Sequence, residues 1–277
     1  MKIQYAAPGI RVFESALFQT TATVLDTPDL VLVVDPNWLP EEVMAIRRYV
    51  DDILDGRPVY VLFTHSDYDH IIGYGAFMEA KTIASEAFAT ETDQDAALAR
   101  VKKWDQEYYI ERDYPALYPQ IDVVARQPGQ AFALGKTRLI FFPAPGHNND
   151  GLFTLATWEG RCIWLAGDYL SAVEFPFIYH SSEAYEQTLH LAAEILEQYQ
   201  PELLVAGHGP ATVSQKEMTQ RISDALSYIQ TMRQCIRENL PFPEEHLWQR
   251  YLFRKGQESF HQDNAVLMQK ELDAQRG

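Results

Sequence analysis

The amino-acid sequence predicts a domain of mixed α and β structure, of the α/β or α+β class. Short runs of apolar and β-branched residues, bounded by turn-forming residues, indicate strands, and segments with apolar residues at helical spacing indicate helices. Strand-like and helix-like segments alternate through most of the chain. With 47% hydrophobic and 12% aromatic residues, the 277 residues also suffice for a large buried core.

The first quarter of the chain is expected to contain four strands and one helix. Turn residues such as Pro8-Gly9 separate the apolar runs, as they do between strands joined by tight turns. The strands are expected at residues 11–13, 21–25, 30–34 and 59–63. The helix is expected between Pro40, which suits a first helical position, and Gly56, which fits just past a helix end.

A second β-rich block follows residue 120. Its strands and its helix are expected at residues 121–125, 138–142, 152–157, 162–166, 183–199 (the helix) and 203–206. Residues 85–120 are polar and helical in composition, and we expect a helical insertion that covers the domain. The tyrosines of this insertion either pack it on the domain or roof a pocket: Tyr108, Tyr109, Tyr114 and Tyr118.

The last part of the chain reads as helices only. Apolar residues recur at helical spacing after residue 214, and prolines interrupt the pattern at 241–243. We therefore expect residues 1–214 to form the main domain and residues 215–277 a C-terminal helical tail packed on it.

The charge of the chain limits its partners. The sequence has 23 Lys and Arg against 39 Asp and Glu, a formal net charge of −16, and no long basic run. Phosphate backbones and anionic lipid surfaces would repel such a protein, so we expect a small-molecule substrate and neither nucleic acid nor membrane. The N-terminus lacks the apolar region of a signal peptide, and two cysteines cannot build a disulfide framework. These features predict a cytoplasmic location, with Cys162 as a core residue.

The segment after the strand at 59–63 carries the clearest chemical signal. It reads Thr-His-Ser-Asp-Tyr-Asp-His, and four of its seven residues are potential metal ligands. In an extended loop His65, Asp67 and Asp69 project to one side, and His70 follows at the start of the next element. A polar loop in which an aspartate caps a helix is the alternative for this segment alone.

Three further strand ends carry the same type of residue. His147 follows Pro145-Gly146, Asp168 follows Gly167, and His208 lies between two glycines. Ligands at the ends of neighbouring strands can converge on one edge of a sheet, where glycine permits close backbone approach. The other four histidines have no such setting and are expected to be surface or packing residues: His180, His190, His246 and His261.

These motifs, in this order, resemble those of the metallo-β-lactamase-fold hydrolase superfamily, in which H-x-H-x-D-H is followed by single His, Asp and His residues. The resemblance covers roughly residues 1–214 and implies a four-layer αββα sandwich. It also implies two divalent metal ions. His65, Asp67 and His147 would surround the first ion, Asp69, His70 and His208 the second, and Asp168 would bridge them.

Asp67 departs from the family pattern, which usually has a second His at this position. A carboxylate is a harder ligand than imidazole, so it favours iron or manganese over zinc, the metal otherwise expected. It also reduces the charge of a site with two divalent ions from +2 to +1, which makes a bound water less acidic.

The resemblance implies hydrolysis by a metal-bound hydroxide, with Asp69 as the candidate proton shuttle. The glycine-flanked last His and the helical tail are similar to those of glyoxalase-II-like thioesterases and lactonases, so we expect a thioester or lactone substrate. An iron-dependent oxidoreductase on the same fold and a non-catalytic metal-binding protein are the alternatives. Four residues are expected to orient substrate: Trp38, Tyr169, Tyr179 and His180. A homodimer through the helical tail is also expected.

Overall fold

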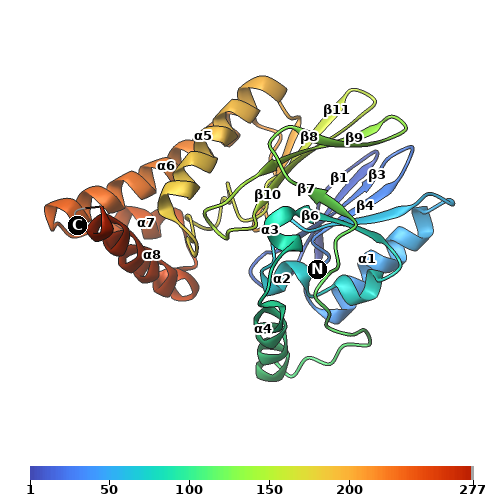
Figure 1. Cartoon of the computed structure of the whole chain (residues 1–277), viewed down its shortest axis with the longest axis horizontal. Coiled ribbons are helices and arrows are strands. Elements are labelled where there is room, and N and C mark those ends of the chain that lie inside the picture. Colours follow the sequence, from blue (N-terminus) through green and yellow to red (C-terminus); the bar gives the residue numbers. More distant parts are fainter. Residues whose placement is uncertain (276–277) are drawn as a thin grey trace.

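Two β-sheets packed face to face form the centre of the computed structural model, which describes residues 1–275 (Figure 1). The first sheet has its seven strands in sequence order: β1 (Lys2–Ala7), β2 (Ile10–Glu14), β3 (Thr21–Asp26), β4 (Val31–Val34), β5 (Val59–Leu62), β6 (Lys81–Ser85) and β7 (Val123–Ala125). Strands β1 to β4 pair antiparallel, and β4 to β7 pair parallel.

The second sheet contains five strands in the order β12-β11-β10-β9-β8. Their bounds are β8 (Gln130–Leu134), β9 (Thr137–Pro143), β10 (Leu152–Trp158), β11 (Arg161–Leu165) and β12 (Leu203–Val205). Neighbours pair antiparallel, except that β11 and β12 are parallel. Because β9 and β11 both run opposite to β10, the carboxyl ends of β9, β11 and β12 lie at the same edge of this sheet.

Helices cover the outer faces of both sheets. In β4, Leu32 and Val34 pack into the core between the sheets, whereas Val31 and Val33 pack on the side of helix α1 (Pro40–Ile53). A strand buried on both faces is a continuous apolar run, as this one is. Helices α5 (Ser182–Tyr199) and α6 (Gln215–Glu238) cover the outer face of the second sheet. The four-layer αββα arrangement expected from the sequence is therefore confirmed.

The covering insertion differs in part from its prediction. Ser85 ends strand β6, which the sequence did not predict, and helices follow at α3 (Glu86–Ala89) and α4 (Gln94–Glu107). Residues 108–120 are irregular rather than helical. Tyr114 and Tyr118 are buried, whereas Tyr109 is 94% exposed, so the tyrosines do not share one packed helical face.

The C-terminal segment packs beside α5 (Figure 1). After α6 it continues as α7 (Glu244–Arg250) and α8 (Arg254–Ala274), and the chain leaves the helical conformation at 239–243. Asn264 donates a hydrogen bond from its side-chain amide to the carbonyl of Pro176, and the Glu271 carboxylate accepts one from the backbone N–H of Ser182. Residues 276 and 277 of the expected tail lie outside the described residues. Within residues 1–275, no helix is both long and apolar enough to cross a bilayer.

The reactivity of Cys162, in β11, tests how well the second sheet and its covering helices exclude solvent. Burial and the nearby charge of Glu202 raise the pKa of its thiol to about 11. Because the thiolate is the reactive species, we expect iodoacetamide to modify Cys162 much more slowly at mildly alkaline pH than it does in concentrated urea. Peptide mass spectrometry would follow the reaction, with the Cys162→Ser variant confirming the assignment. The structure leaves Cys162 half-buried rather than fully in the core, and equal rates in the folded and unfolded protein would contradict even this partial burial.

Candidate metal centre

Seven histidine and aspartate side chains meet at one edge of the two sheets. The positions of these residues follow from the strands and the short helix α2 (Tyr68–Ile71). His65 lies three residues after β5, and Asp67 is the residue before α2, which itself carries Asp69 and His70. The remaining three follow the carboxyl ends of β9, β11 and β12: His147, Asp168 and His208. The structure thus brings together all seven residues that the sequence suggested as ligands.

Four of these residues form a first group, whose potential ligand atoms lie within 4.8 Å of one another: His65, Asp67, His147 and Asp168. His147 Nε2 lies 3.2 Å from Asp67 Oδ2 and 3.3 Å from Asp168 Oδ2. His65 Nε2 is 3.6 Å from the same oxygen of each aspartate. Asp67 therefore occupies a position from which a carboxylate can reach the same ion as the two imidazoles.

Asp69, His70 and His208 form a second group, with the same 4.8 Å limit between potential ligand atoms. Asp168 also reaches this group, because its Oδ1 lies 3.1 Å from His70 Nε2 and its Oδ2 lies 3.2 Å from His208 Nε2. A Cβ atom on Gly207 would lie only 2.1 Å from Asp168 Oδ1, so a side chain there would collide with the carboxylate. Glycine at 207 makes room for an aspartate that contacts both groups.

Hydrogen bonds from Nδ1 orient three of the histidine rings. His147 Nδ1 donates to the carbonyl of Phe177 at 2.7 Å, and His208 Nδ1 donates to that of Phe18 at 3.0 Å. His70 Nδ1 lies 2.9 Å from Asp35 Oδ2. A ring that donates from Nδ1 presents the lone pair of Nε2, which in all three faces the cluster. This tautomer is the one that binds a metal through Nε2.

Buried polar atoms test whether the cluster suits a cation. His65 Nε2, His70 Nε2 and Asp168 Oδ1 are buried, and none of them makes a hydrogen bond with any residue from 1 to 275. Buried polar atoms normally have partners, so three nitrogen and oxygen atoms without one, gathered in one cluster, indicate a missing positive charge. Divalent ions bound by imidazole and carboxylate would satisfy all three atoms, and the residues therefore fit such ions.

The electrostatics of the cluster agree with that fit. Burial would raise the pKa of Asp67, but His147 and His65 outweigh it and hold the pKa well below the usual range. Burial and His70 lower the pKa of His65, but Asp168 and Asp67 outweigh them and raise it to about 10. The carboxylates also outweigh burial at His70 and His208 and raise their pKa values, so without an ion His65, His70 and His208 keep protons that balance the carboxylates. A metal ion binding here would displace those protons.

Several residues of the site carry no signal that the sequence analysis used. Asp35 directly follows strand β4 and accepts hydrogen bonds from Thr64 N at 2.9 Å and Thr64 Oγ1 at 2.6 Å, besides contacting His70. Asp35 follows a buried strand that runs parallel to the strand before His65. This position in the sequence could have indicated that Asp35 lies near His65. Thr20 donates from Oγ1 to Asp69 Oδ2 at 3.3 Å.

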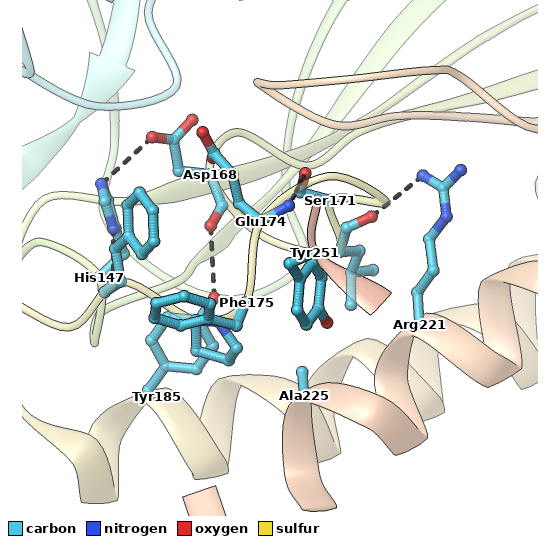
Figure 2. Close-up of a pocket in the computed structure, with 12 residues that line it drawn as sticks. His147, Asp168, Ser171, Glu174, Phe175, Tyr185, Arg221, Ala225 and Tyr251 are labelled. Carbon is cyan, nitrogen blue, oxygen red and sulfur yellow. Dashed lines mark hydrogen bonds and ion pairs between the residues drawn. The ribbon is translucent and has the colours of Figure 1, made fainter. Parts of the chain in front are cut away.

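Glu174 is a second acid that the sequence analysis did not single out. Its side chain is 13% exposed, its Oε1 lies 3.9 Å from His208 Nδ1, and Figure 2 shows it beside Asp168 and Ser171. Burial raises the pKa of Glu174, His208 lowers it, Asp168 and Asp69 raise it, and the result is about 7. The only signal in the sequence was an acid within an otherwise apolar, aromatic loop.

The residues expected to orient substrate separate into two pairs. Trp38 is fully buried and packs against Phe18, Tyr68 and Trp104, so the expectation that it orients substrate is wrong. Tyr169 is also buried, and its hydroxyl donates to the carbonyls of Ala144 and Pro145 and accepts from His147 N. These contacts make it a support for the His147 loop rather than a substrate contact.

Tyr179 and His180 are both exposed. The Tyr179 ring lies 5.0 Å from that of His147, beside the first group. The backbone N–H of His180 donates to the carbonyls of Gly146 and His147, so this residue fixes the loop through its main chain. A role in substrate binding stays a prediction for both side chains.

Comparison with known proteins agrees with this geometry. A family model described as the metallo-beta-lactamase superfamily matches residues 16–208. A search of curated proteins gives no match. Among solved structures, a metallo-beta-lactamase family protein of Thermus thermophilus is 17% identical, with 97% of this chain and 94% of the other covered and a TM-score of 0.65.

Two further structures show how widely the fold is shared. A metallo-beta-lactamase of Cronobacter sakazakii is 22% identical, covers 98% of each chain and has a TM-score of 0.53. A sec-alkylsulfatase of a Pseudomonas species is 13% identical, with 84% of this chain and 42% of the other covered and a TM-score of 0.60. At these identities the likeness is one of fold.

Asp35 provides a test of the ring orientation. Asp35→Asn keeps the side-chain volume but weakens its contacts to His70 and Thr64, so we expect metal affinity to fall by ~10–100-fold with the fold retained. Competition with a chromophoric chelator would measure the affinity, and circular dichroism would check the fold. Asp52→Asn, on an exposed position of α1, is the matched control. Unchanged affinity in Asp35→Asn would contradict the positioning role.

Proposed function

This chain belongs to the metallo-β-lactamase superfamily, and on that premise we propose that it is a metal-dependent hydrolase of small ester-type substrates. A thioester or a lactone is the first candidate. The observation that supports hydrolysis is the set of seven inward-facing His and Asp residues, with three buried acceptor atoms that have no hydrogen-bond partner among residues 1–275. Hydrolytic metal sites combine this kind of donor set with rigid, oriented rings.

We propose that the two groups hold one divalent ion each. His65, Asp67 and His147 would hold the first, Asp69, His70 and His208 the second, and Asp168 would contact both. Divalent ions there would supply a water of lowered pKa and would polarise the carbonyl oxygen of the substrate. The contribution of the protein is to orient these ligands before substrate arrives.

Asp69 is proposed to move the proton in this reaction. It would take a proton from the attacking water and deliver it to the departing oxygen or sulfur, so that one water adds across the broken bond. Its Oδ2 lies 3.6 Å from His208 Nε2, and the hydroxyl of Thr20 donates to the same oxygen. These contacts keep the carboxylate directed at the centre of the cluster.

An iron-dependent oxidoreductase is the second candidate, and Asp67 favours it. A carboxylate at this position adds a hard oxygen ligand, which suits iron or manganese better than an imidazole does. Iron-loaded protein would then show absorption changes with reductant and oxygen that zinc-loaded protein lacks. Ester hydrolysis with no such redox response would exclude this candidate.

Removal of a ligand tests the hydrolase proposal. His147→Ala or Asp168→Ala should lose bound metal and lower ester turnover by more than the ~10–100-fold cost of losing a metal-orienting partner. Elemental analysis and assays on thioester, lactone and phosphodiester panels with Zn, Mn and Fe would measure both effects. His190→Ala, at an exposed position of α5, is the control.

The outcomes of this experiment separate the candidates. Full activity in either ligand variant would overturn the assignment of the site. Metal binding by the unaltered protein without turnover of any ester would instead identify a non-catalytic metal-binding protein.

Asp67→His tests how the carboxylate sets metal preference. The imidazole is a softer ligand and leaves the site less negative, so we expect the ratio of zinc to manganese affinity to rise by at least ~10-fold. Competition titrations with both metals would measure the ratio. A ratio unchanged within twofold would show that Asp67 does not bind the metal. Asp52→Asn again serves as the control for a lost surface charge.

A further inference from the structure

A cavity of about 570 Å³ lies next to the metal centre. Three stretches of the chain form its walls: residues 16–19 before β3, residues 173–177 after β11, and residues 252–260 at the start of α8. Its volume falls in the range of ~300–1,000 Å³ that is usual for small-molecule sites. The C-terminal segment therefore does more than pack on the main domain, because it supplies one whole wall of this cavity.

Two wall residues connect the cavity to the metal centre. The carbonyl of Phe18 accepts the hydrogen bond from His208 Nδ1, and the carbonyl of Phe177 accepts the one from His147 Nδ1. Both phenylalanines also line the cavity, as does Glu174, which shares a second small pocket with Asp168 and His147 (Figure 2). A molecule in the cavity would therefore lie against Phe18 and Phe177, whose carbonyls hold one histidine of each metal group.

The walls are mainly apolar, and some are open to solvent. Phe18 is 44% exposed, Leu252 78% and Phe253 54%, and all three line the cavity. Large exposed apolar side chains that gather at one opening are typical of a binding site, because the rest of a protein surface seldom carries them together. Val173, Phe177 and Phe260 are less exposed and also line the cavity, so its inner wall is apolar as well.

Gln257, a residue of the wall, has one side-chain atom without a hydrogen-bond partner among residues 1–275. Gln257 is 4% exposed, and its Nε2 donates to the carbonyl of Val173 at 2.8 Å. Its Oε1 is buried and accepts no hydrogen bond from any described residue. Exchanging the two amide atoms would place an oxygen against a carbonyl, so the orientation is fixed by the bond to Val173. A buried acceptor of this kind needs a donor from water or from a ligand.

We propose that this cavity binds the apolar chain of the substrate and that Gln257 Oε1 accepts a hydrogen bond from an N–H or O–H group on that chain. The substrate class is then an ester, thioester or lactone that carries an aliphatic chain and one donor close to it, such as an amide. The reaction part of this statement rests on the proposed hydrolase function, whereas the binding part does not.

Binding of non-hydrolysable probes tests the proposal directly. N-methyloctanamide has an eight-carbon acyl chain and one N–H donor, N,N-dimethyloctanamide lacks the donor, and N-methylbutanamide lacks half of the chain. Calorimetry with the metal-loaded protein should show N-methyloctanamide bound about fivefold more tightly than the dimethyl probe, because a typical net hydrogen bond is lost. The four-carbon probe should bind at least ~10-fold more weakly, because four buried methylene groups are missing.

Two variants locate the binding. A Cβ at Gly256 would meet no atom within 4 Å, and Gly256 lines the cavity, so Gly256→Phe fills the cavity while it replaces a poor helix former. It should reduce affinity for N-methyloctanamide at least ~10-fold. Val266→Phe, at an exposed position of the same helix away from the cavity, should leave it unchanged. Gln257→Met should abolish the preference for the N–H donor.

Each result bears on the proposal. Equal affinity for the long and short probes, or unchanged binding in Gly256→Phe, would overturn the assignment of the cavity. Equal affinity of the unaltered protein for the two eight-carbon amides would overturn the role of Gln257, even if Gln257→Met failed to fold. If the probes bind as expected but no ester is hydrolysed, the proposed function is contradicted while the assignment of the binding site is supported.

Discussion

The carboxylate of Asp168 is the contact on which the arrangement of the site depends. One side chain approaches Nε2 atoms of four histidines, at 3.1 to 3.6 Å, and these histidines follow strands of both sheets. It can do so because Gly167 and Gly207 bring the ends of β11 and β12 together, with the N–H of Gly207 donating to the carbonyl of Gly167 at 2.6 Å. The edge where the sheets meet is therefore also the place where negative charge is concentrated.

Supports for the rings reach the cluster from several layers of the fold. Asp35 directly follows β4, Phe18 lies in the loop before β3, and Phe177 lies in the loop after β11. Each accepts a hydrogen bond from Nδ1 of one imidazole, so Nε2 of that ring is free to act as a ligand. The geometry of the centre is a property of the whole sandwich rather than of the His-Ser-Asp-Tyr-Asp-His segment alone.

The ligand cluster was predictable from sequence because its signals are local. Buried strands are continuous apolar runs, and the Pro-Gly-His, Gly-Asp and Gly-His-Gly sequences follow them directly. The sandwich itself required the family resemblance, since periodicity alone predicts only mixed α and β. Strands β1 and β8 were missed because they lie at sheet edges with one face in solvent, where the apolar pattern is diluted.

Features built from distant contacts were beyond the reach of local patterns. Trp38 follows a strand end just as the ligands do, yet it is buried among aromatic rings from three other segments. Tyr169 comes directly after Asp168, but its hydroxyl bonds to the loop that carries His147. The cavity beside the metal centre is lined by residues more than 230 positions apart in the sequence, and no short motif can predict that they lie together.

The position of the helical tail affects how the substrate selectivity of this protein can evolve. The candidate metal ligands lie between residues 65 and 208, whereas one wall of the neighbouring cavity comes from residues 252–260. On the proposed mode of binding, substitutions in that wall would alter which molecules are accepted without touching a single metal-facing atom. Selectivity and reactivity are then carried by separate stretches of chain, free to diverge at different rates.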